Sequence, residues 1–312
     1  MNREEKIIPH FGENLYTYIW SNVESPKGIV HIFHGMVEHS GRYDEFANYL
    51  NSRGYIVISS DHRGHGETGK DKGLGYIGEE GFYGIVKDKK FLSDYIRDRF
   101  KGIPLFILGH SFGSFIAQEY LIQYSNDIDG IIFSGSAKND GVDIILGNIA
   151  ANIQSVLIDD SKPARLIDKM AFGGFNRSVK SPKTKFDWLS RDDEQVQKYI
   201  NDRYCQFIPS INFYKNLFSG LRRLYKKYRL DRINKNINIL VISGDRDPVG
   251  KMGKSVQRLY QQYKDLNIKG VTLKLYEGGR HEMLNETNKG EVYEYIYKWI
   301  ELLNLQMDIQ DK

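Results

Sequence analysis

Apolar and polar residues follow one another along this chain in blocks that predict strands and helices in turn. Uninterrupted apolar runs indicate buried strands, and apolar positions spaced by three or four residues indicate helices. Strands are predicted at 28–34, 54–60, 104–108 and 128–134, with an alternating edge strand at 15–20 and helices at 43–53, 84–101 and 112–124. Continuous apolar strands separated by helices are typical of a parallel sheet that is covered on both faces.

This alternation stops near residue 138. Residues 139–222 have helical spacing but no convincing strand. Strands and helices are predicted again at 237–242, 252–264, 271–276 and 290–303. We therefore expect one α/β core, made of residues 1–138 and 223–312, that is interrupted by a helical cap at 139–222.

The composition is that of an ordinary folded chain. Of the 312 residues, 40% are hydrophobic and 27% are charged, and the formal net charge is +4 at pH 7. Such a small charge does not indicate nucleic-acid binding. The basic run at 222–229 predicts a solvated helix face, with contact to an anionic membrane surface or a charged headgroup as the alternative.

Cysteine content and the chain start bear on the compartment. Cys205 is the only cysteine, so a reducing compartment is permitted, and we expect its side chain to be buried in the cap rather than reactive. The charged residues 1–6 lead into no apolar signal segment, and no apolar run approaches the roughly 20 residues of a membrane span. These features predict a cytoplasmic protein; peripheral membrane contact through the cap and the oligomeric state stay open.

Residues 109–113 read Gly-His-Ser-Phe-Gly and stand between a predicted strand and a predicted helix. In this position Gly-x-Ser-x-Gly is typical of a nucleophile elbow, a sharp turn that exposes its serine. Side chains two positions before and after the serine would collide in such a turn, which accounts for the glycines. We predict Ser111 as a nucleophile, with the N-terminus of the helix behind it available to a developing oxyanion.

A serine nucleophile needs a base, and the base needs an acid that orients it. In this architecture the acid and then the histidine follow the serine along the chain, each at the end of a strand. His281 is the only histidine after residue 110, and it is the predicted base. Asp245 and Asp247 both follow the strand at 237–242; the usual spacing from the preceding glycine favours Asp247, and Asp245 is the alternative.

The oxyanion of an acyl-transfer intermediate needs two N–H donors. Phe112, directly after the nucleophile, should supply one, and Met36, in the turn after the strand at 28–34, should supply the other. The aspartate and two histidines within 61–66 suggest zinc by residue type. A serine mechanism needs no metal, so we expect that segment to support the site and expect no metal and no cofactor.

The motifs that carry chemistry lie at 34–43, 61–66, 109–113, 244–248 and 279–282. Together they resemble the α/β-hydrolase superfamily, and within it the monoacylglycerol lipase and lysophospholipase-like group, which includes serine aminopeptidases. The string at 34–43 is the most specific, and the stretch 188–205 resembles the cap of these enzymes. The resemblance implies an α/β-hydrolase fold, a triad of Ser111, Asp247 and His281, and oxyanion donors at Met36 and Phe112.

The expected activity is hydrolysis of carboxylic esters of monoacylglycerol or lysophospholipid type through an acyl-enzyme on Ser111. Apolar stretches at 144–149 and 156–158 are expected to line an acyl tunnel or to pack against the core. An apolar, capped cleft favours a fatty-acyl ester over a peptide, because a peptide needs many backbone partners and an acid for its ammonium group. The alternatives are an aminopeptidase or acyltransferase with the same triad, and a catalytically silent binding protein on this fold.

Overall fold

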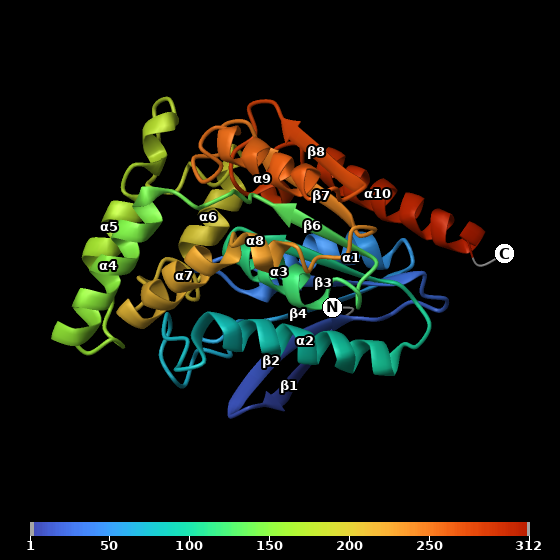
Figure 1. Cartoon of the computed structure of the whole chain (residues 1–312), viewed down its shortest axis with the longest axis horizontal. Helices are drawn as coiled ribbons and strands as arrows, with labels where there is room; N and C mark the ends of the chain where they lie inside the picture. The colour runs from blue at the N-terminus through green and yellow to red at the C-terminus, as the bar shows by residue number, and fades with distance from the viewer. Residues whose placement is uncertain (1–2, 311–312) are drawn as a thin grey trace.

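An eight-stranded sheet forms the centre of the computed structural model, which describes residues 3–310 (Figure 1). The strands are β1 (Glu4–His10), β2 (Glu13–Trp20), β3 (Gly28–Phe33), β4 (Tyr55–Ser60), β5 (Leu105–His110), β6 (Gly130–Ser134), β7 (Asn238–Gly244) and β8 (Gly270–Tyr276). Their order is β1-β2-β4-β3-β5-β6-β7-β8. Strand β2 is antiparallel to β1 and β4, and the remaining neighbours are parallel. The carboxyl ends of the parallel strands therefore meet at one edge, where the loops of α/β proteins form sites.

Helices cover both faces because the side chains of each strand alternate between two apolar layers. On one face lie α1 (Asp44–Asn51) and α10 (Lys289–Gln310); on the other lie α2 (Gly81–Arg99), α3 (Phe112–Tyr124) and α9 (Lys254–Asp265). Within β5, Ile107 belongs to the second layer and Leu108 to the first. The mostly parallel sheet with helices on both faces, which the sequence predicted, is confirmed.

Two elements of the core differ from expectation. Strand β1 was not predicted, because its sequence is mostly polar and its two isoleucines are adjacent, so that Ile8 is buried while Ile7 is 62% exposed. It forms the antiparallel edge of the sheet, where a charged sequence protects against pairing with other chains. Helix α10 begins at Lys289 and continues to Gln310, seven residues beyond the predicted end at 303.

Between β6 and β7 the described residues form helices and no strand. These are α4 (Val142–Leu157), α5 (Arg165–Phe172), α6 (Asp193–Asn201), α7 (Ile211–Leu224) and α8 (Lys227–Leu230). Short 3-10 turns lie at Ser40–Tyr43, Phe175–Ser178 and Met283–Asn285. Helix α4 packs along α7, and the pair lies beyond the carboxyl ends of the strands (Figure 1). Helix α7 runs two residues past position 222, and the cap boundaries themselves stay predictions.

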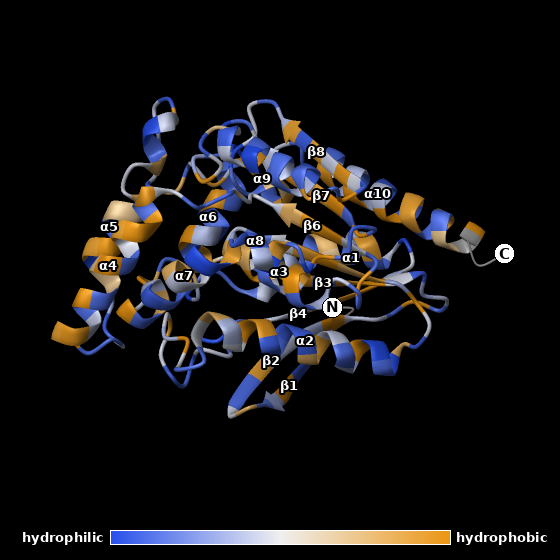
Figure 2. Cartoon of the chain, viewed as in Figure 1, coloured by the Kyte–Doolittle hydropathy of each residue, from blue (hydrophilic) through white to orange (hydrophobic). Residues whose placement is uncertain are grey.

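Apolar residues run along much of α4 and α5 (Figure 2). Even so, within residues 3–310 no helix combines the length and the apolar character that crossing a bilayer requires.

Candidate active site

Ser111 lies in the sharp turn between β5 and α3. Its backbone is in the left-handed half of conformational space, with φ of 50° and ψ of −118°. Such a conformation is strained for a residue with a Cβ and persists only where its surroundings enforce it. Here the Ser111 N–H donates to the Ser134 carbonyl of β6 at 3.0 Å, and the Ser114 N–H donates to the Ser111 carbonyl at 2.9 Å. The turn is thus held by hydrogen bonds on both sides of the serine.

The two glycines of the turn are required by close backbone contacts. A Cβ at Gly113 would lie 2.1 Å from the Phe33 carbonyl oxygen and 2.3 Å from that of His34. A Cβ at Gly109 would lie 2.6 Å from the Gly113 carbonyl oxygen. Because backbone atoms cannot move aside as a side chain can, only glycine fits either position, as the sequence pattern predicted.

The structure brings Asp247 and His281 together after β7 and β8. The His281 Nδ1–H donates to Asp247 Oδ2 at 3.0 Å. The same carboxylate accepts from the Ser243 hydroxyl at 3.1 Å and, through Oδ1, from the Val249 N–H at 2.8 Å. Both Asp247 and His281 are buried, so the imidazole is fixed in orientation with Nε2 left for another partner.

Burial and charge oppose each other in this pair. Burial lowers the pKa of His281, but the Asp247 carboxylate, with Glu282 and Glu38 nearby, outweighs burial and holds it above the ordinary value. Burial raises the pKa of Asp247. The His281 ring, together with the hydrogen bonds that the carboxylate accepts from Val249 and Ser243, outweighs burial and holds the pKa of Asp247 below its ordinary value. The carboxylate is therefore ionised beside a ring that readily accepts a proton.

Asp245, the alternative acid, is placed differently. Its Oδ1 accepts the Gly278 N–H at 2.8 Å, and its closest cation is the neighbouring Arg246 at 3.6 Å. It therefore ties the loop after β7 to the loop after β8. Asp247, and not Asp245, accepts the hydrogen bond from the His281 ring.

The two expected oxyanion donors flank Ser111. Phe112 is the first residue of α3, and Met36 belongs to the turn after β3. That turn approaches the serine closely, since a Cβ on Gly35 would lie 3.3 Å from the Ser111 Cβ. Within the described residues neither the Met36 N–H nor the Phe112 N–H donates to a protein group, which leaves both for a ligand.

Histidines of the segments 34–43 and 61–66 hold the turn after β3 in place. The His62 N–H donates to His34 Nε2 at 2.8 Å, and His62 Nε2 lies 2.8 Å from the His34 carbonyl. Asp61 accepts the Ser40 N–H at 2.8 Å and the Glu67 N–H at 2.9 Å. No group of three or more His, Cys, Asp or Glu side chains within residues 3–310 is arranged to hold a metal ion.

A buried ionic cluster beside the triad was not assigned by sequence reasoning. Arg42 donates to both carboxylate oxygens of Glu282, at 2.8 and 2.7 Å, and to Glu38 at 2.6 Å. Glu38 also accepts from the Tyr43 hydroxyl at 2.8 Å. Glu282 directly follows His281, so the cluster fixes the histidine's loop to the oxyanion turn. Its members belong to the string at 34–43 and to residues 279–282, where the sequence signal was present without a role attached.

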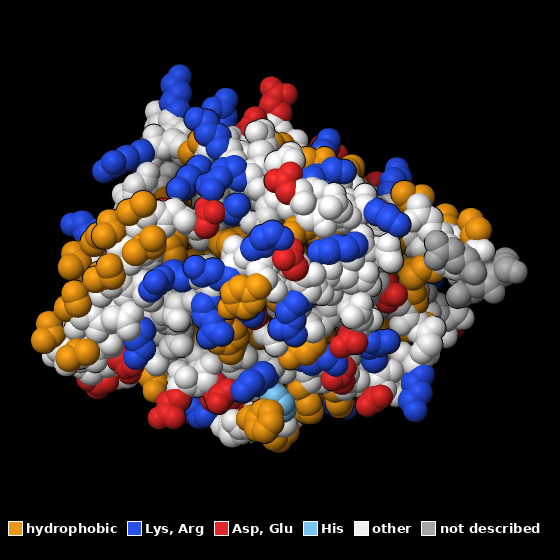
Figure 3. Space-filling model, viewed as in Figure 1, with side chains coloured by type: hydrophobic (Ala, Val, Ile, Leu, Met, Phe, Trp, Pro, Cys, Tyr) orange, Lys and Arg blue, Asp and Glu red, His pale blue; other side chains and the backbone are white. Residues whose placement is uncertain are grey.

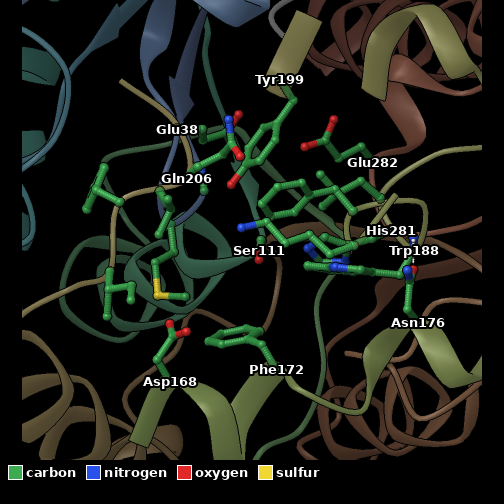
Figure 4. A pocket seen from close by; sticks show the side chains of 18 of the residues that line it. Glu38, Ser111, Asp168, Phe172, Asn176, Trp188, Tyr199, Gln206, His281 and Glu282 are labelled. Carbon is green, nitrogen blue, oxygen red and sulfur yellow. Dashed lines mark hydrogen bonds between the residues drawn. The ribbon is translucent and has the colours of Figure 1, made fainter. Parts of the chain in front are cut away.

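Ser111 lies where two cavities meet. Both cavities are lined by Met36, Ser111 and Phe172. The first, of about 450 Å³, adds polar groups that include Glu38, His281, Asn176 and Gln206 (Figure 4). The second, of about 420 Å³, adds mainly apolar groups, among them Phe115, Ile144, Ile167, Leu217 and Phe218. The site thus has one mainly apolar branch and one branch of mixed lining, in which these polar groups lie among apolar ones such as Trp188 and Phe207, with the serine between the two.

Other expectations for the cap have mixed outcomes. From the stretch 144–149, Ile144, Leu146 and Gly147 line the apolar branch, whereas Val156 is 85% exposed and Leu157 is 76% exposed. The 156–158 stretch therefore neither lines a tunnel nor packs on the core. Cys205 is buried, as expected, and burial raises the pKa of its thiol.

The basic run at 222–229 is only partly a solvated face. Arg229 is buried and pairs with the buried Glu119 of α3, so the prediction is wrong for this residue. Arg222 donates to the Asn148 side chain of α4 at 2.9 Å. Lys227 is exposed and pairs with Asp231. The spacing of the run did not reveal that Arg229 attaches this segment to α3.

Comparison with known proteins places this geometry in a family. The family model described as serine aminopeptidase, S33, matches residues 24–288. A monoacylglycerol lipase of Mycolicibacterium smegmatis is 28% identical, covering 90% of this chain and 91% of its own. A monoglyceride lipase homolog of Monkeypox virus is 27% identical, and the match covers 92% of this chain and 94% of the viral protein.

Among solved structures, a thermostable carboxyl esterase from Bacillus coagulans in complex with glycerol superposes with a TM-score of 0.90. It is 26% identical, and the match covers 97% of this chain and 99% of the esterase. The family match spans most of the chain, and the fold extends over nearly all of it. The chain belongs to the serine aminopeptidase S33 family of α/β-hydrolases.

Proposed function

We propose that this protein hydrolyses carboxylic esters of monoacylglycerol type through an acyl-enzyme on Ser111. His281 takes the proton of the Ser111 hydroxyl through Nε2 as the serine oxygen attacks the ester carbonyl. Asp247 holds the ring and stabilises its charged form. The carbonyl oxygen, now an oxyanion, accepts hydrogen bonds from the Met36 and Phe112 amides.

Collapse of this intermediate breaks the bond to the alcohol, which leaves with the proton carried by His281. Water then gives a proton to His281 and attacks the acyl carbon. The second intermediate releases the fatty acid, and the proton returns to Ser111. Each proton taken is given back within the cycle, so the reaction needs no group beyond the triad, the two amides and water.

The branched cavity is the observation that carries this proposal. A monoacylglycerol has one apolar acyl chain and one small polar alcohol, joined at the ester carbon that the serine attacks. The apolar branch at Phe115, Ile144 and Leu217 suits the chain, and the branch of mixed lining, with Gln206 and His281 among its polar groups, suits the small polar alcohol. Ser111 between the branches fits the position of the ester.

The charge arrangement favours an ester over a peptide with a free amino group. An aminopeptidase needs a carboxylate available to the substrate's ammonium group. The carboxylates that line the cavity beside His281 are engaged within the protein: Glu38 and Glu282 share the Arg42 guanidinium, and Asp168 accepts from the Tyr214 hydroxyl. A neutral polyol, by contrast, asks only for hydrogen-bond partners.

Two measurements test the proposal together. A fluorophosphonate probe should label the folded wild-type protein and leave Ser111→Ala unlabelled; no labelling of the wild type would favour a silent binding protein. A panel of monoacylglycerols, p-nitrophenyl esters and aminoacyl anilides then separates the remaining activities. Turnover of the anilides without cleavage of long-chain esters would identify an aminopeptidase, and net transfer to added alcohols in place of hydrolysis would identify an acyltransferase.

We also propose that the enzyme touches lipid surfaces through the outer face of α4. Val142, Ile145, Ile149, Ile153 and Val156 recur at intervals of three or four and are all exposed, so they form one apolar stripe along the helix. Leu146, also exposed, borders the apolar branch of the cavity. Exchange of Ile149 and Ile153 for Gln should slow hydrolysis of vesicle-borne substrate; equal loss with substrate dispersed in detergent would contradict surface contact.

A further inference from the structure

The segment that follows the apolar stripe is strongly basic. Residues 162–185 contain seven Lys and Arg side chains, all exposed, and one acidic residue, Asp168. Its net charge of +6 exceeds the +4 of the whole chain, so the rest of the molecule is on balance acidic. Asp168 is half-buried and accepts from the Tyr214 hydroxyl. The charge at this end of the protein is therefore concentrated in one segment.

Most of these cations have no ion-pair partner within residues 3–310. Of the seven, only Lys183 has an ion-pair partner, Asp193, among the described residues. Of the acids just before the segment, Asp160 pairs with Lys215 and Asp159 is exposed. Exposed cations without partners repel one another, which costs stability unless an anionic partner is present when the protein works.

The basic residues and the apolar stripe belong to the same surface. On α5, Arg165 and Lys169 alternate with Leu166 and Met170, which are 61% and 71% exposed. Figure 3 shows an apolar edge over α4 and α5, with Lys and Arg side chains beside it and above it. Met170 also lines the apolar branch of the cavity. The surface therefore combines apolar contact, positive charge and the cavity that leads to Ser111.

We propose that residues 162–185, with the stripe on α4, dock this protein on lipid surfaces that carry anionic headgroups. This inference rests on the proposed lipid-ester function and adds the charge of the partner surface. Apolar side chains enter the boundary between headgroups and acyl chains, while the surrounding cations lie at the level of the phosphates. An acidic protein would satisfy the cations but not the apolar stripe at the mouth of an acyl cavity, so a lipid surface fits both features.

The size of the effect follows from the number of charges. One Lys or Arg close to an anionic bilayer strengthens binding about fivefold. Loss of three cations should therefore weaken binding about 100-fold on an anionic surface and leave binding to a neutral surface nearly unchanged. The effect should also shrink in high salt, since exposed charges are screened within about 10 Å at 0.1 M ionic strength.

The test is co-sedimentation of the full chain with vesicles of phosphatidylcholine alone and of phosphatidylcholine mixed equally with phosphatidylglycerol. The variant Arg165→Gln, Arg177→Gln, Lys180→Gln removes three exposed cations outside the cavity lining. The matched control, Lys101→Gln, Lys264→Gln, Lys269→Gln, removes three exposed lysines near the amino ends of β5 and β8, at the opposite edge of the sheet.

The wild type and the control should bind the mixed vesicles about 100-fold more tightly than the cap variant does. Equal binding of the wild type to both vesicle types, or an equal loss in the control, would overturn the proposal. If the cap variant fails to fold, the salt dependence of the wild type on the two vesicle types decides instead. Hydrolysis of monoacylglycerol in detergent is measured on the same samples, so a failure of the proposed function is visible separately from a failure of docking.

Discussion

Replacement of Arg42 by Gln tests whether the ionic cluster beside His281 holds the site together. The change keeps a polar but shorter side chain and removes the charge and the paired contacts to Glu282, at 2.8 and 2.7 Å. Both carboxylates of the cluster, Glu38 and Glu282, stay buried without their cation. The expected result is a large loss of stability at neutral pH.

The magnitude follows from the titration of Glu282. Burial raises its pKa, but Arg42 outweighs burial and lowers it from 4.5 to about 2. At 1.36 kcal/mol per pKa unit this corresponds to about 3 kcal/mol of stability. Because the folded pKa is the lower one, that stability is present above pH 4.5 and is lost as the pH falls through 2. Mutations that remove one partner of a buried ion pair in other proteins cost about 3–5 kcal/mol of stability, which agrees with this value.

Urea denaturation of the wild type and the variant at several pH values measures the effect. Without the guanidinium the buried Glu282 has a raised pKa and must be held ionised at pH 7, so the variant should be less stable by about 3–5 kcal/mol. The gap should narrow as the pH falls toward 4.5, because the raised pKa lets Glu282 protonate in the folded variant, and it should narrow further below pH 4.5 as the wild type loses the contribution of its lowered pKa. Arg232→Gln, at an exposed arginine, is the control and should change stability by less than about 0.5 kcal/mol. A gap below about 1 kcal/mol, or one that does not vary with pH, would refute the reasoning.

Three further outcomes are expected. Gly113→Ala should yield no folded protein by circular dichroism, since its Cβ would lie against backbone oxygens, whereas Gly290→Ala, with nothing within 4 Å, should fold and keep its melting temperature or raise it. The acid limb of kcat/KM reports the pKa of His281, which Asp247 holds above the ordinary value of 6.5, so its midpoint should lie above pH 6.5. Asp247→Asn should lower this midpoint and should also lower kcat about 10⁴-fold. Burial lowers the pKa of Lys89 from 10.5 to about 7, so between these pH values the unfolded chain binds more protons than the folded protein does. The stability of the wild type should therefore rise between pH 7 and pH 10 by about 3 kcal/mol more than the stability of Lys89→Met, which thermal melts can measure.

Much of the core was predictable because local patterns and the fold agree there. Strands β3, β5 and β7 are mainly apolar and are buried over almost their whole length, and each is followed by a motif whose chemistry needs a strand end. The elbow glycines show the same agreement, since their spacing reflects close backbone contacts, of Gly113 with the end of β3 and of Gly109 with Gly113, that are invisible in the sequence but obligatory in the turn. These positions have only one sterically allowed residue.

The remainder depends on contacts between distant segments. Arg229 looked like part of a solvated basic run, and only the packing of α8 on α3 turns it toward Glu119. The exposed stretch at 156–158 is apolar in sequence exactly as a buried one would be, and its solvent-facing position follows from how α4 packs on α7. Periodicity predicts an apolar face but not what covers it.

The central claim is that Ser111 cleaves a monoacylglycerol ester. Its most direct test is the release of free fatty acid from monoacylglycerols of increasing chain length, dispersed in detergent, by the wild type and by Ser111→Ala. The account predicts turnover by the wild type and a loss of about 10⁴-fold or more in kcat for the variant, with the fold unchanged. Fatty-acid release by Ser111→Ala at the wild-type rate, or no release by a wild-type protein that cleaves aminoacyl anilides, would contradict it.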